Sequence, residues 1–177
     1  PMTSVNIGEA SATDIFEVNI TSNQQAAYPV GTTTVNWTAT DANSNQSSAS
    51  QSVTVVDTTA PDFTLTQETD KLWPPNHKMV LVGVISQVGD LVDGNPNVVI
   101  NVTSNQAING NGDGNTNYDW EVIQVGDTWE VWLRAERAGP KDARHYTIEV
   151  TVSDSNGNSS SATAVATVPH DKGKKGK

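Results

Sequence analysis

The 177-residue sequence contains no cysteine. This absence excludes a disulfide framework, a thiolate nucleophile and a cysteine-based zinc site. The sequence also lacks an apolar run of about 18 residues of the kind that spans a bilayer, and no segment has the pattern of a signal peptide. We therefore expect no membrane insertion, and the folded state has to rely on its hydrophobic core and on any metal ions that it binds.

Positive charge is scarce. Ten Lys and Arg residues stand against twenty Asp and Glu residues, which gives a formal net charge of −10 at pH 7. Phosphate binding requires clustered basic side chains, so this balance argues against nucleic acids and anionic membranes as partners. The exception is a basic tail, residues 172–177, with four lysines separated by glycines. We expect the tail to be a solvated terminus, with a docking arm as the alternative.

No window of the chain carries a sustained helical period. Ser, Thr, Asn, Val and Gly dominate the composition instead, a mixture that suits β-strands and their turns. Apolar and polar residues alternate over several segments, which is the period of a strand buried on one face. The sequence therefore predicts an all-β protein.

The chain contains an internal repeat. Thr34 to Asp57 aligns with Thr147 to His170 at a constant offset of 113 residues, so that Asp41 corresponds to Asp154. Each copy consists of an alternating strand, an Asx-rich turn and a second alternating strand. This pattern predicts a β-hairpin that ends a domain in each copy, with Trp37 on the inward face and in the core.

A second match has a different offset. Asn19 to Gln24 (NITSNQ) corresponds to Asn101 to Gln106 (NVTSNQ) at an offset of 82 residues. The difference predicts an insertion in the second copy, spanning 107–143, in which Trp120 to Glu136 forms a hairpin around Gly126-Asp127. With a boundary at Asp57 to Asp62, the predicted domains are 1–58 and 59–177.

These segments resemble two known modules. Tyr28 to Pro61 is similar to the hyalin-repeat module. The second domain, with LWPPNHKMV from Leu72, LRAER from Leu133 and the final SDSNGNSSSATAVATVPHD, resembles the immunoglobulin-like C-terminal module of secreted and surface bacterial proteins. The resemblance implies two tandem immunoglobulin-like antiparallel β-sandwiches, the second with an inserted hairpin, in a secreted or cell-surface protein.

The resemblance also implies a strand that the first domain lacks. Hyalin-repeat modules open with a strand before the one predicted at Val5 to Ala10, and Phe63 to Thr66 supplies its counterpart in the second domain. An unpaired sheet edge is a template for another strand. Either an upstream part of a longer chain or a neighbouring subunit supplies this strand by β-addition, or the first domain folds with one strand fewer.

The loop 109–119 has the alternation of a calcium-binding loop. Oxygen-bearing side chains stand at every second position, and Gly114 is sixth. The closing Glu of an EF-hand is missing, so we expect weak affinity, and an Asn/Gly turn is the alternative. Asp41 and Asp154 are expected to bond their own turns. The candidate calcium ligands, including an acidic set around the domain boundary, are Asn109, Asn111, Asp113, Asn115, Asp119, Asp90, Asp93, Asp57 and Asp62.

Three tryptophans of the insertion indicate an alternative function. Trp120, Trp129 and Trp132 lie on the predicted hairpin, and the last two are three positions apart, so they face opposite sides of a strand. An exposed tryptophan can stack on a sugar ring. The alternative function is therefore a carbohydrate-binding accessory module of a secreted hydrolase, although packing of the insertion on the sandwich explains the same residues.

A catalytic centre finds little support. His77, His145 and His170 are scattered, no Ser lies in a nucleophile-elbow context, and no glycine-rich phosphate loop precedes a helix. We predict a non-catalytic extracellular structural or adhesive module: a stalk, a spacer or a subunit of a surface assembly. Calcium and strand addition between neighbouring immunoglobulin-like subunits are the expected means of stiffening and joining it.

Overall fold

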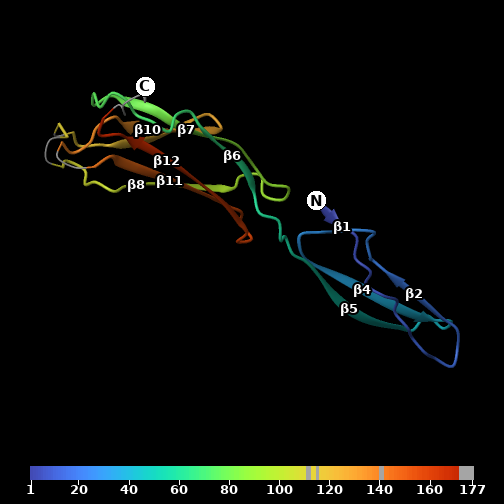
Figure 1. Ribbon diagram of the computed structural model, residues 1–177. Coiled ribbons are helices and arrows are strands. Elements are labelled where there is room, and N and C mark those ends of the chain that lie inside the picture. The colour runs from blue at the N-terminus through green and yellow to red at the C-terminus, as the bar shows by residue number, and fades with distance from the viewer. Residues whose placement is uncertain (111–112, 115, 140–141, 172–177) are drawn as a thin grey trace, which may run out of the picture. The chain divides into compact units, whose positions relative to one another are not determined.

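The computed structural model describes residues 1–110, 113–114, 116–139 and 142–171. These residues form twelve β-strands and no helix, so the predicted all-β class is confirmed, and none of them belongs to a helix that could cross a membrane (Figure 1). Every pair of neighbouring strands in the sheets is antiparallel. The chain divides into two compact units, Pro1–Thr58 and Thr59–Lys177.

The first unit holds one three-stranded sheet, in the order β2-β4-β5, and one short pair, β1-β3. Its strands are β1 (Met2–Thr3), β2 (Val18–Ser22), β3 (Tyr28–Pro29), β4 (Gly31–Asp41) and β5 (Gln46–Val55). The predicted hairpin is confirmed, since β4 and β5 pair without interruption from Gly31↔Val55 to Thr40↔Gln46. Threonine and valine fill these strands because branched side chains fit a pleated surface.

The core of the first unit is small. Only Tyr28, Val35 and Val53 are buried hydrophobic residues in it, with Val5, Ile7, Trp37 and Val55 packed against them. The prediction that Trp37 belongs to the core is confirmed in part, because its side chain packs against this cluster but is only partly buried. On the sheet face that carries Trp37, Tyr28 of the short pair β1-β3 packs with Val35 and Val53, and farther along that face Trp37 and Ala39 remain partly exposed.

The predicted strand at Val5 to Ala10 is not formed. The chain pairs only at β1, and the Asn6 side chain then accepts a hydrogen bond from the Gly8 amide at 3.0 Å. Gly8 adopts the left-handed conformation, with φ of 77°. This Asx turn ends the extended path, so that Val5 and Ile7 reach the core without a sheet ladder.

The second unit is a sandwich of two sheets, in the orders β6-β7-β10-β9 and β12-β11-β8. Its strands are β6 (Asp62–Gln67), β7 (Met79–Gly89), β8 (Asn97–Ser104), β9 (Trp120–Val125), β10 (Thr128–Arg134), β11 (Arg144–Ser153) and β12 (Ser159–Val168). The strand expected at Phe63 to Thr66 is confirmed as part of β6, and the hairpin expected in the insertion is confirmed as β9 and β10.

Alternate residues of β11 form the centre of this sandwich. Tyr146, Ile148, Val150 and Val152 are each 0% exposed. They pack against Ala164, Ala166 and Val168 of β12 and against Ile85, Val131 and Leu133 of the opposite sheet. The buried apolar area, rather than hydrogen bonding alone, supplies the main favourable free energy of such a core.

The two repeated hairpins have the same alternating pattern, but their inward faces are buried to different extents. Val35 of β4 and its counterpart Ile148 of β11 are both buried. The next two inward positions differ, because Val150 and Val152 are 0% exposed whereas Trp37 and Ala39 stay partly exposed. The second unit therefore has a covering sheet over a face that the first unit leaves open.

Candidate functional site

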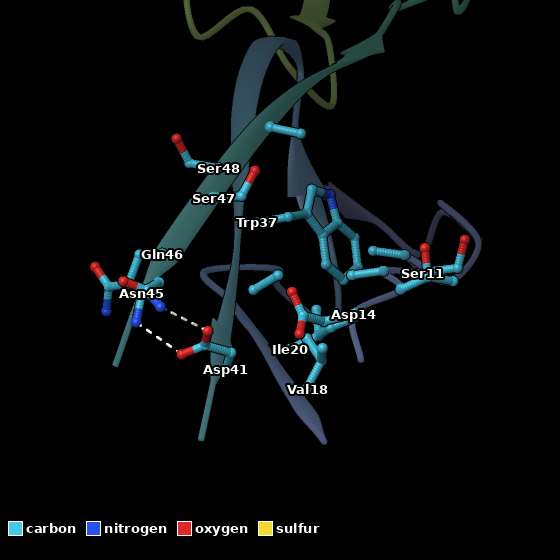
Figure 2. A pocket seen from close by; sticks show the side chains of 15 residues that line it. Ser11, Asp14, Val18, Ile20, Trp37, Asp41, Asn45, Gln46, Ser47 and Ser48 are labelled. Atoms are coloured by element: carbon cyan, nitrogen blue, oxygen red, sulfur yellow. Dashed lines mark hydrogen bonds between the residues drawn. The ribbon is translucent and has the colours of Figure 1, made fainter. Parts of the chain in front are cut away.

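A cavity of about 440 Å³ lies over the open face of the first unit (Figure 2). The strand register places its apolar floor on one side of the sheet, since Ile20 pairs with Ala39 and Trp37 pairs with Ala49. The extended segment 10–14 forms one wall, and the start of β5 forms the other. The cavity thus occupies the place that a second sheet fills in a complete sandwich.

Two carboxylates, Asp14 and Asp41, line this cavity together with Trp37, and the Asp41 carboxylate is turned toward Asn45 (Figure 2). Asp14 Oδ1 accepts a hydrogen bond from the Phe16 amide at 3.0 Å, which fixes that side chain. Asp41 accepts bonds of 2.8 Å from the amides of Asn43 and Asn45 and of 2.7 Å from Asn45 Nδ2. The Asn45 side chain, together with the two amides, holds the pKa of Asp41 below its usual value, so Asp41 is ionised at neutral pH.

The first unit contains no basic side chain to neutralise these groups. The first Lys, Arg or His of the sequence is Lys71, and the acidic residues before it are Glu9, Asp14, Glu17, Asp41, Asp57, Asp62, Glu68 and Asp70. All of the chain's lysines and arginines belong to the second unit. The cavity therefore combines an aromatic ring, an aliphatic floor and uncompensated negative charge.

The predicted calcium loop contains two deeply buried carboxylates. Asp113 and Asp119 are each 1% exposed. Both carboxylate oxygens of Asp113, and Oδ1 of Asp119, have no hydrogen-bond partner among the described residues. Asn111 and Asn115 lie outside the described residues, and Asn109 is exposed with φ of 57°. A buried unpaired carboxylate is costly, and a cation offsets that cost.

A charged network lies beneath this loop. Asp119 pairs with Arg144, which also approaches Glu136 at 3.8 Å, and all three side chains are buried. Glu136 accepts a 2.7 Å bond from Thr116 Oγ1, and His77 Nδ1 lies 3.2 Å away. Burial, reinforced by the neighbouring Asp119 carboxyl, raises the pKa of Glu136.

The sequence interpretation missed Glu136 and Arg144 as members of this network. Arg144 begins β11 at a position that continues the buried alternation of Tyr146 and Ile148, and its guanidinium lies 4.6 Å from the centroid of the Tyr146 ring. A charged residue in register with a buried strand face was the available signal. Burial also raises the pKa of Tyr146 well above its usual range.

The second predicted acidic set is brought together in part. Asp90 Oδ1 accepts bonds from the amides of Val92 at 2.7 Å and Asp93 at 2.8 Å, and Asp93 Oδ2 accepts one from Ser155. Asp90 Oδ2 is buried without a partner, and a carboxylate oxygen of Asp90 lies within 4.8 Å of one of Asp154. Asp154 was not predicted as a ligand, although it does bond its own turn as expected.

The other two residues of that set are placed separately. Asp62 is exposed at the start of β6, where it pairs with Gly89, the residue before Asp90. Asp57 is 6% exposed near the end of the first unit. Backbone amides of Asn95 and Ser155 hold the pKa of Asp93 below its usual value, so Asp93 remains charged at neutral pH.

The three tryptophans of the insertion divide between the two faces of their sheet. Trp120 and Trp129 pack against the core, and Trp120 meets Tyr146 edge to face with ring centroids 6.4 Å apart. Trp132 lies on the other face, opposite Glu121 of β9, and its indole N–H donates to Glu130 at 2.9 Å. The expectation that Trp129 and Trp132 face opposite sides is confirmed, and only Trp132 is free of the core.

Comparison with known proteins gives no family assignment. No family model matches the sequence, and no curated protein matches it. Solved structures of protocadherin ectodomains are similar in fold. The extracellular domain of protocadherin gamma B4 is 13% identical with a TM-score of 0.45, covering 85% of this chain and 25% of that chain. The protocadherin gamma B7 EC3-6 cis-dimer is 13% identical with a TM-score of 0.42, covering 86% and 40%.

A third such structure, PcdhgB3 EC1-4, is 18% identical with a TM-score of 0.41, covering 77% of this chain and 31% of that chain. The chain thus spans less than half the length of these solved structures. With TM-scores below 0.5, these similarities carry no argument about this chain.

Proposed function

We propose that this chain is a non-catalytic, extracellular structural or adhesive module that joins neighbouring subunits through its first unit. The observation that carries the proposal is the open sheet face of that unit. Val18, Ile20, Trp37 and Ala39 line a cavity there, while the equivalent face of the second unit is covered by a four-stranded sheet. The resemblance to hyalin-repeat and bacterial immunoglobulin-like modules supports two tandem domains and a secreted or surface location.

Completing the first unit with a segment from a neighbour is energetically favourable. Removing apolar surface from water stabilises an assembly by about 25 cal/mol per Å². Trp37 and the aliphatic residues beside it are partly exposed, so a docked segment gains this term without unfolding anything first. The open face is therefore a binding surface of the folded unit.

The edge of the first sheet supports joining by strand addition. β5 is an outer strand of the sheet β2-β4-β5, and Gln46 to Ser50 are all exposed. An outer strand presents a row of N–H and C=O groups that a further strand can pair with. From outside the sheet, the Ile7 carbonyl accepts a side-chain bond from Gln51 Nε2 of β5 at 3.2 Å.

Calcium binding belongs to the proposal as a means of stiffening. The support is local to the second unit: Asp113 has two unpaired oxygens in a buried site, and Asp90 has one beside Asp154. Oxygen ligands of this kind suit a hard divalent cation, and calcium fits flexible loops better than magnesium does.

Carbohydrate binding is the second candidate function, and one observation favours it. Trp132 lies on the outer face of its sheet between Glu130, which holds its indole N–H, and Glu121 on the neighbouring strand. An aromatic ring flanked by carboxylates can stack on a sugar and accept hydrogen bonds from its hydroxyls. On this alternative the chain is a monomer, and polysaccharide retention depends on Trp132.

The oligomeric state tests the proposed function. Light scattering of the purified chain over a range of concentrations, with and without millimolar calcium, is expected to show reversible self-association. Ile20→Asp places a charge on the open face and should abolish it, whereas Asn19→Asp places the same charge on the opposite face and should not. A monomer at every concentration, or equal effects of the two variants, contradicts the proposal.

A further inference from the structure

The cavity of the first unit has the chemistry of a lysine-binding pocket. A lysine side chain needs an apolar surface for its four-carbon stem and negative charge for its ammonium group. Val18, Ile20 and Ala39 supply the apolar floor, and Trp37 adds an aromatic ring that attracts a cation. Asp14 and Asp41 supply the charge at the rim (Figure 2).

Asp14 offers a carboxylate oxygen to a ligand, whereas both oxygens of Asp41 accept hydrogen bonds from its own turn and Asp41 adds its negative charge. Asp14 is exposed, and the hydrogen bond that it accepts from the Phe16 amide uses Oδ1. Asp41 stays ionised because Asn43 and Asn45 donate to it. Since the first unit has no Lys, Arg or His, any cation that neutralises this pair comes from outside the unit.

The chain itself carries one segment that matches this pocket. Residues 172–177 hold four of the ten basic side chains in six positions, on a protein of net charge −10. The arginines of the second unit are engaged within it, since Arg134 and Arg137 donate to backbone carbonyls and Arg144 pairs with Asp119. The lysine-rich tail is therefore the densest positive charge available to the acidic first unit.

We propose that the cavity of the first unit binds the basic tail, residues 172–177, of a second copy of this chain. The inference rests on the proposed function, in that it names the segment through which neighbouring subunits join. Each copy offers this pocket and a tail, so two copies can exchange tails in a closed dimer, and more copies can link head to tail into rings or open chains. Because the attraction is between exposed charges, added salt weakens it.

The first experiment measures binding of a labelled peptide with the sequence of residues 172–177, KGKKGK, to the full chain by fluorescence polarisation. We expect saturable binding that weakens at least tenfold in Asp14→Asn and that falls between 50 and 500 mM salt, by the screening of exposed charges. Glu17→Gln is the matched control, because it removes the same charge from the same unit outside the cavity. An equal loss of peptide affinity in both variants would show that the peptide is attracted to net charge alone, and it would overturn the cavity as the binding site.

The aromatic side of the pocket has its own readout. Trp37→Leu keeps an apolar side chain and removes the ring, so we expect weaker peptide binding while the hairpin stays folded, as judged by circular dichroism. A peptide in which each Lys is replaced by Gln tests the ammonium group and should not bind. Binding that survives Trp37→Leu unchanged overturns the role of the ring.

The second experiment separates this inference from the proposed function. Deleting residues 172–177 is expected to lower self-association of the chain and to leave its thermal stability unchanged. Self-association that persists in the deletion variant overturns the tail as occupant while leaving the proposed function intact. A third outcome is a monomeric full chain that binds the peptide only after residues 172–177 are deleted. In that case the tail occupies the pocket of its own molecule, which overturns a second copy as its source.

Discussion

Trp129 and Trp132 show how residues of one type, three positions apart, take different roles. Trp129 shares its sheet face with Val131 and Leu133 and packs on the core, whereas Trp132 faces outward beside Glu130. We expect Trp129→Ala to lower the free energy of unfolding by roughly 3 kcal/mol and Trp132→Ala by less than about 1 kcal/mol. Denaturant unfolding of the two variants measures the difference, and equal losses would contradict this placement.

Glu136 gives the chain a titrating group within its core network. Its pKa is raised in the folded state, so the folded protein binds this proton more tightly than the unfolded chain does. The stabilising contribution is therefore complete below the ordinary pKa of Glu and is lost as pH rises through the raised value. Glu136→Gln, which mimics the neutral acid, should remove this loss. Its stability relative to wild type is expected to increase from acid to neutral pH.

Unfolding curves of wild type and Glu136→Gln at several pH values check the sign. Asp93→Asn serves as the opposite control, because the pKa of Asp93 is lowered and its contribution is lost as pH falls. A constant difference between wild type and Glu136→Gln would mean that folding does not change the pKa of Glu136, and it would contradict the raised value.

At the scale of single residues, sequence patterns identified most of the side chains of interest but did not predict which residues surround them. Alternation placed Val35 and Ile148 on inward faces and put Trp129 and Trp132 on opposite sides of their strand, because the period of a strand is read directly from the sequence. It could not place Arg144 and Glu136 in the interior, since their burial depends on mutual pairing across the insertion. Trp37 is less buried than expected for a related reason, because burial requires a covering layer as well as an inward direction.

The two repeated hairpins turn in the same way with different residues. Gly157 has φ of 92° in the second hairpin, and its counterpart in the first, Ser44, has φ of 71°. Left-handed backbone costs a residue with a side chain about 1 kcal/mol more than glycine. We expect Ser44→Gly to stabilise the first unit by roughly 0.5 kcal/mol, after the entropy that glycine adds to the unfolded chain, and Gly157→Ser to destabilise the second by about 1 kcal/mol.

Thermal unfolding of the two exchanges is the measurement. A side chain at Gly157 would meet no atom within 4 Å, so its cost is conformational and no clash enters the comparison. Destabilisation by Ser44→Gly would contradict the strained left-handed turn.

The loop 109–119 is expected to bind calcium through Asp113. In the affinity range of about 10⁻⁴ to 10⁻³ M, calcium at ~10 mM should stabilise the second unit by about 1–3 kcal/mol. Asp113→Asn should remove this gain, and Asp127→Asn, an exposed turn residue, should retain it. Melting temperatures with calcium and with chelator test both variants, and a calcium effect that survives Asp113→Asn would exclude the loop as the site.

The strands and hairpins could be predicted from local sequence more closely than the candidate sites could. The hairpins β4-β5, β9-β10 and β11-β12 were predictable because their turns and alternation lie in consecutive residues. The strand expected at Val5 to Ala10 was lost to the Asx turn of Asn6 and Gly8. A short local hydrogen bond there outweighs a strand that has no neighbour to pair with.

At the scale of the whole molecule, the repeat predicted two similar hairpins but could not predict that their inward faces are buried to different extents. The second unit has fourteen buried core residues in one cluster, and the first has three. A fold gains stability roughly in proportion to the apolar surface that it buries, so the two units differ in stability although they share a motif. This difference in core size is the physical reason for proposing the first unit, rather than the second, as the one that binds a partner.

The chain is therefore expected to unfold in two transitions at dilute concentration, the first unit melting at the lower temperature. Val35→Ala and Val150→Ala remove the same atoms from buried positions of the two units and should each cost roughly 2 kcal/mol. By differential scanning calorimetry, Val35→Ala should lower only the first transition and Val150→Ala only the second. Bound tail peptide should raise the first transition alone, because a ligand stabilises the unit that holds its site. A single transition that both variants shift together would instead mean that the units fold as one cooperative body.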